Sequence, residues 1–328
     1  MRAPEFWRRR GGFADVVLSP LGAAYSLAGA VRRRLTTPWR APVPVICVGN
    51  LTVGGAGKTP TALALAGTLH DMNLRVAFLS RGYGGRLRGP VAVDAARHTA
   101  RDVGDEPLLL AERAPTWVAR NRKDGARLAI ADGADVVVMD DGLQNPTLHQ
   151  DLKLVVVDAE YGFGNGRVIP AGPLREPLPQ GLARADAFVL VGEGGDDLAR
   201  NLSRHAPVLR ARLVPDAAAR QLAQTRVYAF AGIGRPQKFF TSLEKLGAVI
   251  AGRRAFPDHH PYSEDEAMRV IETAAALGAV PVTTTKDAMR LPAAIRGMVT
   301  PLRVDLVFDD PAALRRLLQT TVQDLVRA

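Results

Sequence analysis

A glycine-rich stretch that ends in lysine and threonine is the clearest chemical signal in the chain. It reads Gly49-Asn-Leu-Thr-Val-Gly-Gly-Ala-Gly-Lys-Thr59, and we expect it between a buried strand and a helix. Backbone N–H groups in such a turn, with a helix N-terminus behind them, bind phosphate oxygens. Lys58 would neutralise the β- and γ-phosphates, and the Thr59 hydroxyl would hold Mg²⁺. The predicted nucleotide-binding residues are Thr52, Val53, Gly54, Gly55, Ala56, Gly57, Lys58 and Thr59.

One position of this stretch departs from the usual phosphate-binding pattern. A glycine is expected five residues before Gly57, and the chain has Thr52 there. The run from Gly54 to Thr59 still carries the amides, the ammonium group and the hydroxyl that the chemistry needs. The competing interpretation is a glycine turn beside a surface lysine. The strand expected before it and the helix expected after it favour the phosphate loop.

Two adjacent carboxylates, Asp140 and Asp141, follow an apolar run at 134–140. A buried strand would deliver them to the carboxyl edge of a parallel sheet, where a metal ion lies beside the phosphates. Acids at strand ends also cap helices, so the pair alone leaves both roles open. Because a phosphate loop accompanies them, we predict that Asp140 and Asp141 bind Mg²⁺ or its water ligands.

Strands that alternate with helices must position these groups. Helices are expected over 59–71 and 105–114, between short apolar runs rich in β-branched residues. This alternation predicts an α/β fold of the P-loop NTPase type, with a parallel sheet and helices on both faces. The expected strands are 42–48, 75–80, 134–140, 152–158 and 187–191.

A proline- and glycine-rich loop at 162–180 and a second α/β run after about residue 220 complete the organisation. Loops of that length in a compact domain are usually functional. The second run has expected strands at 227–231 and 280–284 and expected helices at 235–247 and 263–277. The predicted units are an N-terminal basic and apolar helical segment (1–40), a P-loop kinase core (41–215) and a smaller C-terminal α/β subdomain (216–328), with the boundary between the last two placed within 195–225.

Composition limits the classes of function. The chain has 328 residues, 47% of them apolar and 23% charged, which is typical of a packed globular protein. Its single cysteine, Cys47, excludes an internal disulfide framework and any multi-cysteine metal site. The net charge of +10 favours anionic partners such as nucleotides, nucleic acid or an acidic membrane. Aromatic residues are not interleaved with basic runs, so we expect no nucleic-acid partner, and nothing indicates an obligate protein partner.

The N-terminal segment is uncharged from Val16 to Val31 and has arginines on both sides. The run is shorter than the ~20 residues that span a bilayer. It could lie on a membrane surface, pack on the protein's own core, or be a signal peptide with Ala28-Gly29-Ala30 as its cleavage site. Asp15 and Pro20 argue against the signal peptide, and we predict a membrane-associating helix. The flanking arginines are Arg2, Arg8, Arg9, Arg10, Arg32, Arg33 and Arg34.

Several classes of P-loop protein fit the sequence less well than a metabolic kinase or ligase. A GTPase usually carries [NT]-K-x-D for guanine, and Thr285-Lys-Asp287 is followed by Ala288, so the spacing fails. The signature of a transport ATPase is absent from the sequence. Two alternatives stay open beside a lipid kinase: a soluble kinase or ligase acting on a small metabolite, and a nucleotide-dependent switch ATPase.

Seven motifs, in order, carry a resemblance to a known family. From about residue 10 to 320 the chain resembles the tetraacyldisaccharide 4′-kinases, the lipid A 4′-kinases of Gram-negative bacteria. Thr285 departs from the glutamate expected in that family. The motifs are Val48-Gly-Asn-Leu-Thr-Val-Gly-Gly-Ala-Gly-Lys-Thr-Pro60, Ser80-Arg-Gly-Tyr-Gly-Gly85, Gly104-Asp-Glu-Pro107, Asp140-Asp-Gly-Leu-Gln144, Gly172-Pro-Leu-Arg-Glu-Pro177, Asp258-His259 and Thr284-x-Lys-Asp287.

The resemblance implies a reaction and a location. The γ-phosphate of ATP would pass, with Mg²⁺, to the 4′-hydroxyl of a tetraacylated glucosamine disaccharide 1-phosphate, which gives lipid IVA. The acceptor is an acylated lipid held in the inner membrane. The enzyme would therefore work as a peripheral or monotopic protein at the cytoplasmic face of that membrane, and the N-terminal helix would contact its surface.

A sugar hydroxyl is a poor nucleophile and needs a positioned proton acceptor. Asp105 is the candidate base, with His259 paired to it, as the resemblance also implies; from spacing alone Asp105 could be a helix N-cap. Arg175 would be a cation near the γ-phosphate and Glu176 an acid of the metal site, where the alternative is a surface ion pair. We expect Lys286 and Asp287 to serve the nucleotide base or to brace the two halves.

Overall fold

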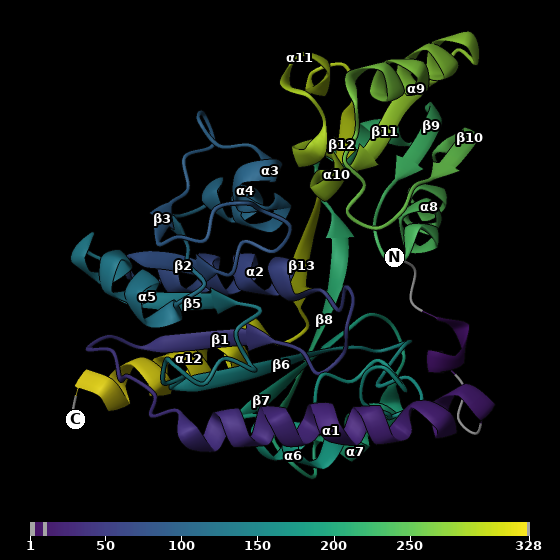
Figure 1. The fold of residues 1–328 in the computed structure, drawn as a ribbon. Helices are drawn as coiled ribbons and strands as arrows, with labels where there is room; N and C mark the ends of the chain where they lie inside the picture. Colours follow the sequence, from purple (N-terminus) through teal and green to yellow (C-terminus); the bar gives the residue numbers. More distant parts are fainter. Residues whose placement is uncertain (1–3, 9–11, 327–328) are drawn as a thin grey trace.

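A nine-stranded β-sheet forms the larger part of the computed structural model, which describes residues 4–8 and 12–326 (Figure 1). All of its strand pairs are parallel except β3 with β4 and β13 with β8. In spatial order the strands are β13 (Val304–Phe308), β8 (Val208–Pro215), β7 (Ala187–Val191), β6 (Leu152–Asp158), β1 (Val45–Gly49), β5 (Val136–Asp140), β2 (Val76–Ser80), β4 (Thr116–Val118) and β3 (Val91–Ala92).

A four-stranded parallel sheet forms the second subdomain, at the upper right of Figure 1. Its strands, in spatial order, are β10 (Val249–Ala255), β9 (Arg226–Ala231), β11 (Val280–Thr284) and β12 (Thr300–Leu302). The helices of this part of the chain are α8 (Pro236–Lys245), α9 (Glu264–Ala276), α10 (Thr285–Arg290) and α11 (Ala293–Arg296), and the short helix η2 (Ala218–Leu222) precedes them.

The central strands of the large sheet are buried on both faces. All five residues of β1 are buried; Ile46 and Val48 join one hydrophobic cluster, and Val45 and Cys47 join the other. This alternation is the period of two of a strand, and it explains why the sequence shows continuous apolar runs. Helices α2 (Lys58–His70), α4 (Asp105–Ala111) and α12 (Pro311–Val326) supply side chains to the first cluster, and α5 (Arg122–Ala131), α6 (Leu178–Ala183) and α7 (Asp196–Leu202) supply them to the second.

The end of the chain returns from the second subdomain to the first. Strand β13 pairs antiparallel with β8, and α12 packs on the first cluster through Leu314 and Leu318. Figure 1 shows β8 and β13 as the two strands that rise from the large sheet towards the second subdomain. The sequence placed all of 216–328 in one C-terminal unit. The structure instead assigns 304–326 to the large sheet, because the apolar side of this strand and helix completes the first cluster.

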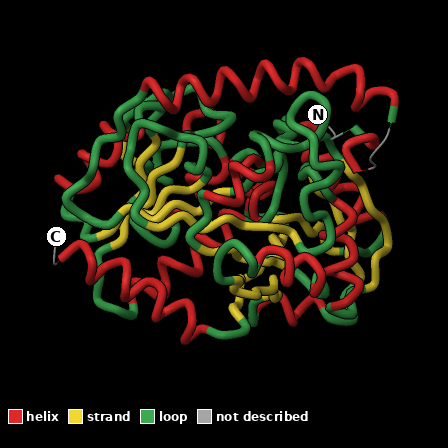
Figure 2. Tube along the Cα trace, turned by 90° about the horizontal axis from the view of Figure 1, so that it is seen from below, coloured by secondary structure: helices red, strands yellow, loops and turns green. Residues whose placement is uncertain are grey.

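The N-terminal segment forms the short helix η1 (Glu5–Arg8) and the long helix α1 (Phe13–Leu35). Helix α1 runs across the bottom of the molecule in Figure 1, and in the view from below it lies along one edge (Figure 2). Three of the predicted flanking arginines, Arg2, Arg9 and Arg10, lie outside the described residues.

The inward face of α1 consists of small or polar residues, including Asp15, Ser19, Gly22 and Ser26. Gly22 is buried against the loop that follows β6, since an added Cβ would lie 2.9 Å from the carbonyl oxygen of Val168. The helix backbone can approach the loop closely at Gly22 because glycine has no side chain there. Most of the large apolar residues of α1 lie on the opposite, exposed face.

The outward face of α1 exposes a row of apolar side chains to solvent. Phe13 is 87% exposed, and the run continues to Leu35 at the other end. Apolar patches of this extent on one element mark interaction surfaces. No helix among residues 4–8 and 12–326 is long and apolar enough to cross a bilayer. The exposed apolar side chains are Phe13, Val16, Val17, Leu21, Tyr25, Leu27, Val31 and Leu35.

A substitution of Gly49, at the end of β1, tests how closely the start of the phosphate loop packs on Leu143. A Cβ there would lie 2.5 Å from the Cβ of Leu143, so we expect Gly49→Ala to destabilise the protein by about 1–3 kcal/mol. Thermal unfolding measures the change. The matched control is Gly67→Ala in α2, where a Cβ would meet nothing within 4 Å and alanine favours the helix. Equal melting temperatures for the two variants would contradict the close approach.

Candidate active site

The glycine-rich stretch forms a turn between β1 and α2, as the sequence predicted. Gly57 has a φ of 95°, in the left-handed region, and Lys58 begins the helix directly after it. A residue with a side chain would be strained at this φ, so glycine is required at the last position of the turn. The N-terminus of α2, with its unpaired N–H groups, therefore lies directly at the end of the turn.

The first half of the turn is pinned by the segment 173–175. The Val53 N–H donates to the carbonyl oxygen of Pro173 at 2.7 Å, and the Arg175 N–H donates to that of Leu51 at 2.8 Å. The amide of Val53, which the sequence placed among the phosphate ligands, is thus engaged within the protein. The N–H groups of Gly55, Ala56 and Gly57 donate to no acceptor within the described part of the chain. These three amides are therefore available to bind phosphate.

Lys58 and Thr59 face the two predicted metal carboxylates. The Lys58 Nζ lies 3.2 Å from the Asn50 Oδ1 and 3.8 Å from the Asp141 Oδ1. The Thr59 hydroxyl donates to the Asp140 Oδ2 at 3.0 Å. The end of β5 and the start of α2 therefore meet at one edge of the sheet, as expected for adjacent parallel strands.

The two carboxylates differ in their protonation. Burial, together with the negative charge of neighbouring Glu106, raises the pKa of Asp140 to about 7. Burial also acts on Asp141, but Lys58 and Arg175 outweigh it and lower its pKa to about 2. Arg175 contacts Asp141 directly, with an NH1–Oδ1 distance of 2.7 Å. Asp140 is thus the carboxylate that lacks a full cationic partner, whereas Asp141 already has two.

The donor set around Asp140 fits a magnesium ion. The Oδ1 of Asp140 and the Oε2 of Glu176 are buried oxygens without a hydrogen-bond partner. The other oxygen of Glu176 accepts from the Gln144 Nε2 at 3.0 Å and from Arg184. Unpartnered carboxylate oxygens are hard donors of the kind Mg²⁺ prefers. The described residues contain no cluster of three or more His, Cys, Asp or Glu side chains suited to a metal, so water and phosphate would supply most ligands.

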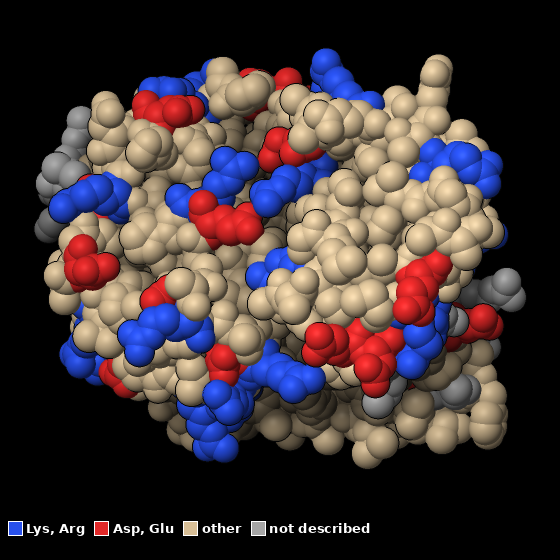
Figure 3. Space-filling view, turned by 90° about the horizontal axis from the view of Figure 1, so that it is seen from above, with Lys and Arg blue, Asp and Glu red and all other residues tan. Residues whose placement is uncertain are grey.

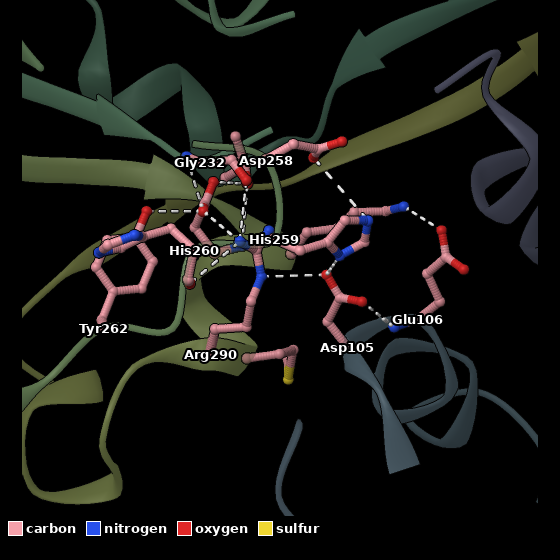
Figure 4. A network of polar contacts seen from close by, with 12 residues as sticks. Asp105, Glu106, Gly232, Asp258, His259, His260, Tyr262 and Arg290 are labelled. Carbon is pink, nitrogen blue, oxygen red and sulfur yellow. Dashed lines mark hydrogen bonds and ion pairs between the residues drawn. The ribbon is translucent and has the colours of Figure 1, made fainter. Parts of the chain in front are cut away.

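Asp105 lies at the start of α4, next to the second subdomain (Figure 4). Its Oδ1 accepts from the N–H of Glu106 at 3.0 Å, and its Oδ2 lies 3.4 Å from the Nδ1 of His259. The side chain is only 3% exposed. The pair that the sequence predicted from residues 154 positions apart is therefore formed, and it joins the two subdomains.

His259 occupies a constrained position. Its φ is 56°, its N–H donates to the carbonyl oxygen of Gly232 at 3.0 Å, and its ring lies edge-on to Tyr83 with centroids 5.4 Å apart. A left-handed φ is costly for histidine, so the surrounding hydrogen bonds must hold it. The ring is 35% exposed. His259 is thus the member of the pair that solvent and a substrate can reach.

The electrostatics of the pair stabilise the charged carboxylate. Burial would raise the pKa of Asp105, but the contact with His259, followed by the charges of Lys286 and Arg290, holds it well below its usual range. The contact with Asp105 in turn raises the pKa of His259. Asp105 therefore stays ionised, and the group of the pair that gains and loses a proton is the imidazole of His259.

Comparison with known proteins identifies the family. A model of the family LpxK, tetraacyldisaccharide-1-P 4′-kinase, matches residues 14–323. Two relatives named tetraacyldisaccharide 4′-kinase, from Rhodospirillum centenum and Rhodospirillum rubrum, are 57% and 52% identical. These alignments cover 97% and 98% of this chain and 96% and 98% of the relatives. The chain belongs to the tetraacyldisaccharide-1-P 4′-kinase family.

A solved structure supports the same assignment. It is the "apo" form of LpxK from Aquifex aeolicus in complex with ATP, with 28% identity and a TM-score of 0.75 over 94% of this chain and 99% of that one. The predicted family, the kinase activity and the P-loop α/β fold are confirmed. Neither the small-metabolite enzyme nor the switch ATPase is supported.

Two charged residues of this kinase site were missed in the sequence. Glu106 binds the Nζ of Lys286 through a 2.6 Å contact of its Oε1, and Arg290 approaches Asp105 with its Nε 3.1 Å from the Oδ2. Both contacts join α4 to α10. The signal for Arg290 was its place three residues after Asp287, on the same helix face. Of the two roles considered for Lys286 and Asp287, bracing the halves is supported for Lys286, through Glu106. The contacts of Asp287, with Gly232, Tyr262 and Thr284, lie within the second subdomain.

A second contact between the subdomains lies at the phosphate loop itself. Arg235, directly before α8, donates to the carbonyl oxygen of Gly55 at 3.0 Å and pairs with Asp158 at the end of β6. Lys238 contacts the same carboxylate at 2.8 Å. On the face of the molecule seen from above, basic and acidic side chains are interspersed, so the positive charge of that face is not gathered in one block (Figure 3).

Gly232 of the kinase offers a test of how the histidine turn is held. An added Cβ would lie 2.9 Å from the carbonyl oxygen of Pro257 and 3.1 Å from the Cβ of His260. We expect Gly232→Ala to displace His259 and to lower kcat at least ~10-fold, while the KM for the nucleotide changes little. Steady-state kinetics measure both constants. The control is Gly247→Ser, where a Cβ would meet nothing within 4 Å and only the local φ of 86° is strained. An unchanged kcat in Gly232→Ala would refute the tight packing.

Proposed function

We propose that this site transfers the γ-phosphate of ATP to the 4′-hydroxyl of an acylated disaccharide 1-phosphate, at the cytoplasmic face of the inner membrane. The observation that carries the proposal is the convergence of a phosphate loop and an Asp–His pair at one edge of the large sheet. Glu106, next to Asp105, is close enough to Asp140 to raise its pKa. The pair therefore lies near the predicted metal site, where phosphate donor and acceptor must meet.

The phosphate loop binds and orients the donor. The amides of Gly55, Ala56 and Gly57 and the ammonium group of Lys58 grip the phosphates, and Arg175 lies beside them at Asp141. Thr59, Asp140 and Glu176 would hold Mg²⁺, with Asp141 placed to bind its waters. Bound there, the ion would neutralise charge on the phosphates. Most of the rate enhancement in such a transfer comes from this positioning and from charge.

The Asp–His pair handles the proton of the acceptor hydroxyl. On the sequence alone, Asp105 is the predicted base, with His259 beside it. Electrostatics favour His259 as the base and Asp105 as its partner. The pKa of the buried Asp105 carboxylate is held far below its usual range, so Asp105 has little tendency to take a proton. His259 would receive the proton at its exposed ring, and Asp105 would orient the imidazole and stabilise its charged form. Tyr83, 64% exposed beside the ring, could pack on the sugar.

The exposed face of α1 supports membrane association. Its apolar side chains point away from the protein, and Arg32 and Arg34 stand exposed at its C-terminal end. An amphipathic helix with flanking arginines binds in the plane of an anionic bilayer surface. Trp7, close to the start of α1, donates its Nε1–H to the carbonyl oxygen of Pro170 at 3.0 Å. The segment before the helix therefore contacts the loop that follows β6, on which Gly22 of α1 also packs. The helix would thus hold the enzyme where its acylated substrate lies.

Transfer of label from ATP tests the function directly. With radiolabelled ATP and tetraacyldisaccharide 1-phosphate in mixed micelles, we expect the wild type to form a labelled lipid. Lys58→Met and Asp105→Asn should each lower the rate by about 10²-fold or more, because one loses the phosphate cation and the other loses the partner of His259. Lys245→Gln, in a peripheral ion pair with Glu193, is the control. No labelled lipid from the wild type would remove the proposal.

Charge on the outward face of α1 tests the membrane contact. We expect the double substitution Val17→Glu and Leu21→Glu to release the protein from anionic vesicles in a sedimentation assay and to raise the KM for the micellar lipid. The KM for ATP should not change, because these side chains are 54% and 59% exposed and touch no part of the site. The control is Met298→Glu, the same kind of change at a 50% exposed residue of the second subdomain. Undiminished vesicle binding would contradict this orientation.

A further inference from the structure

Arg290 is a buried cation that neither the phosphate loop nor the predicted base explains. Its side chain is 7% exposed at the end of α10. The Nε lies 3.1 Å from the Asp105 Oδ2, and NH1 lies 2.9 Å from the Gly232 carbonyl oxygen and 3.3 Å from the Asp287 Oδ1. The guanidinium therefore faces carboxylates of both subdomains at once.

Arg290 and His259 share one oxygen of Asp105. In Figure 4 the contacts from the Arg290 Nε and the His259 Nδ1 end on the same Oδ2. The two residues are also tied to each other through Gly232, whose carbonyl oxygen accepts from the His259 N–H and from Arg290. A planar guanidinium can make both contacts at fixed angles, which a single ammonium group cannot. The arrangement fixes carboxylate, imidazole and guanidinium as one unit.

Asp287 does not need Arg290 as its only partner. The Asp287 carboxylate already accepts from the Gly232 N–H at 2.9 Å, from the Tyr262 hydroxyl at 2.8 Å and from the Thr284 hydroxyl at 2.6 Å. These three donors satisfy a buried carboxylate well. Asp105 depends more on Arg290. Among the described residues, the other side chain in contact with the Asp105 Oδ2 is the imidazole of His259.

We propose that Arg290 is a positioning residue of the Asp105–His259 pair, which holds the carboxylate in place and supplies a fixed positive charge beside the imidazole. The proposal rests on the proposed function, because it assumes that this pair handles the proton of the acceptor. Arg290 does not touch the substrate in this assignment. It acts only through Asp105 and through its charge.

The charges that face His259 make the direction of the effect definite. Asp105 and Asp258 raise the pKa of His259, with Asp258 Oδ1 4.0 Å from the Nε2, whereas Arg290 lowers it. The remaining neighbours are the uncharged ring of Tyr83 and, beyond Asp105, the ammonium group of Lys286. Without the charge of Arg290, less positive charge opposes the two carboxylates, so the pKa of His259 rises. The imidazole then keeps its proton to higher pH and cannot act as a base there.

The pH dependence of kcat tests this role. In the wild type, activity is low where His259 is protonated and rises with pH through the raised pKa of His259. In Arg290→Gln we expect this rise to move to higher pH by about half a unit or more, with kcat recovering towards the wild-type plateau at alkaline pH. A titration of the His259 ring by NMR, in the full-length protein in micelles, should show the same upward shift. An unmoved midpoint in both measurements would overturn the proposal.

Two further variants separate charge from packing. Arg290→Lys keeps the charge and loses the forked geometry, so we expect a lower kcat with the midpoint close to that of the wild type. A midpoint that moves in Arg290→Lys as far as in Arg290→Gln would also overturn the proposal. If Arg290→Gln does not fold, Arg290→Lys decides alone, and a midpoint that lies about half a unit or more from that of the wild type would overturn the proposal. Arg303→Gln is the control, because Arg303 bridges the subdomains to Glu112 at 3.2 Å without touching the pair.

His259→Gln distinguishes this proposal from the proposed function. We expect it to remove the ascending limb of the profile together with most of the activity. Undiminished turnover in His259→Gln would refute the dyad itself. Loss of turnover there, combined with an unmoved midpoint in Arg290→Gln, would refute only the role of Arg290.

Discussion

A buried carboxylate must be compensated by charge or hydrogen bonds, and at Asp105 most of that compensation comes from the other subdomain. Removing the partner of a buried ion pair costs several kcal/mol, because it leaves an uncompensated charge. Three residues of the second subdomain lower the pKa of Asp105, namely His259, Lys286 and Arg290. The contact of Asp105 with His259 therefore exists only while the second subdomain is docked against α4. If this pair receives the proton of the acceptor, as we propose, catalysis requires that docking.

The same logic governs the phosphate loop. The N–H groups of Gly55, Ala56 and Gly57 donate to no acceptor within the described residues, and the carbonyl oxygen of Gly55 accepts from Arg235 of the second subdomain. Arg235 also pairs with Asp158, which joins the end of β6 to the start of α8. The second subdomain thus touches both the phosphate loop and the Asp–His pair, at contacts that charge controls. A phosphate bound to the loop would meet the guanidinium of Arg235 as a further cation close to the site.

Much of this arrangement was predictable because it follows from local rules. The continuous apolar runs predicted the central strands within a few residues, and parallel strands bring Thr59 and Asp140 to one edge. What the sequence could not supply depends on the tertiary fold. Strand β8 and strand β13 carry mixed, half-exposed side chains, so neither has a clear apolar pattern. Arg290 looks like an ordinary basic residue in the last turn of a short helix, and only the docking of α10 on α4 places it beside Asp105.

The position of α1 ties the proposed membrane surface to the chemistry through short rigid contacts. Its small face rests on the loop at Val168, and that loop continues to Leu174, which pairs with Thr52 of the phosphate loop. The loop then supplies Arg175 to Asp141 and Glu176 to the proposed metal site. If α1 lies in the bilayer surface, one continuous segment fixes the height of that surface relative to the phosphates. The outward apolar face is costly in water, and a membrane contact would give this cost a function, because it places the loop and the acceptor hydroxyl at a set distance.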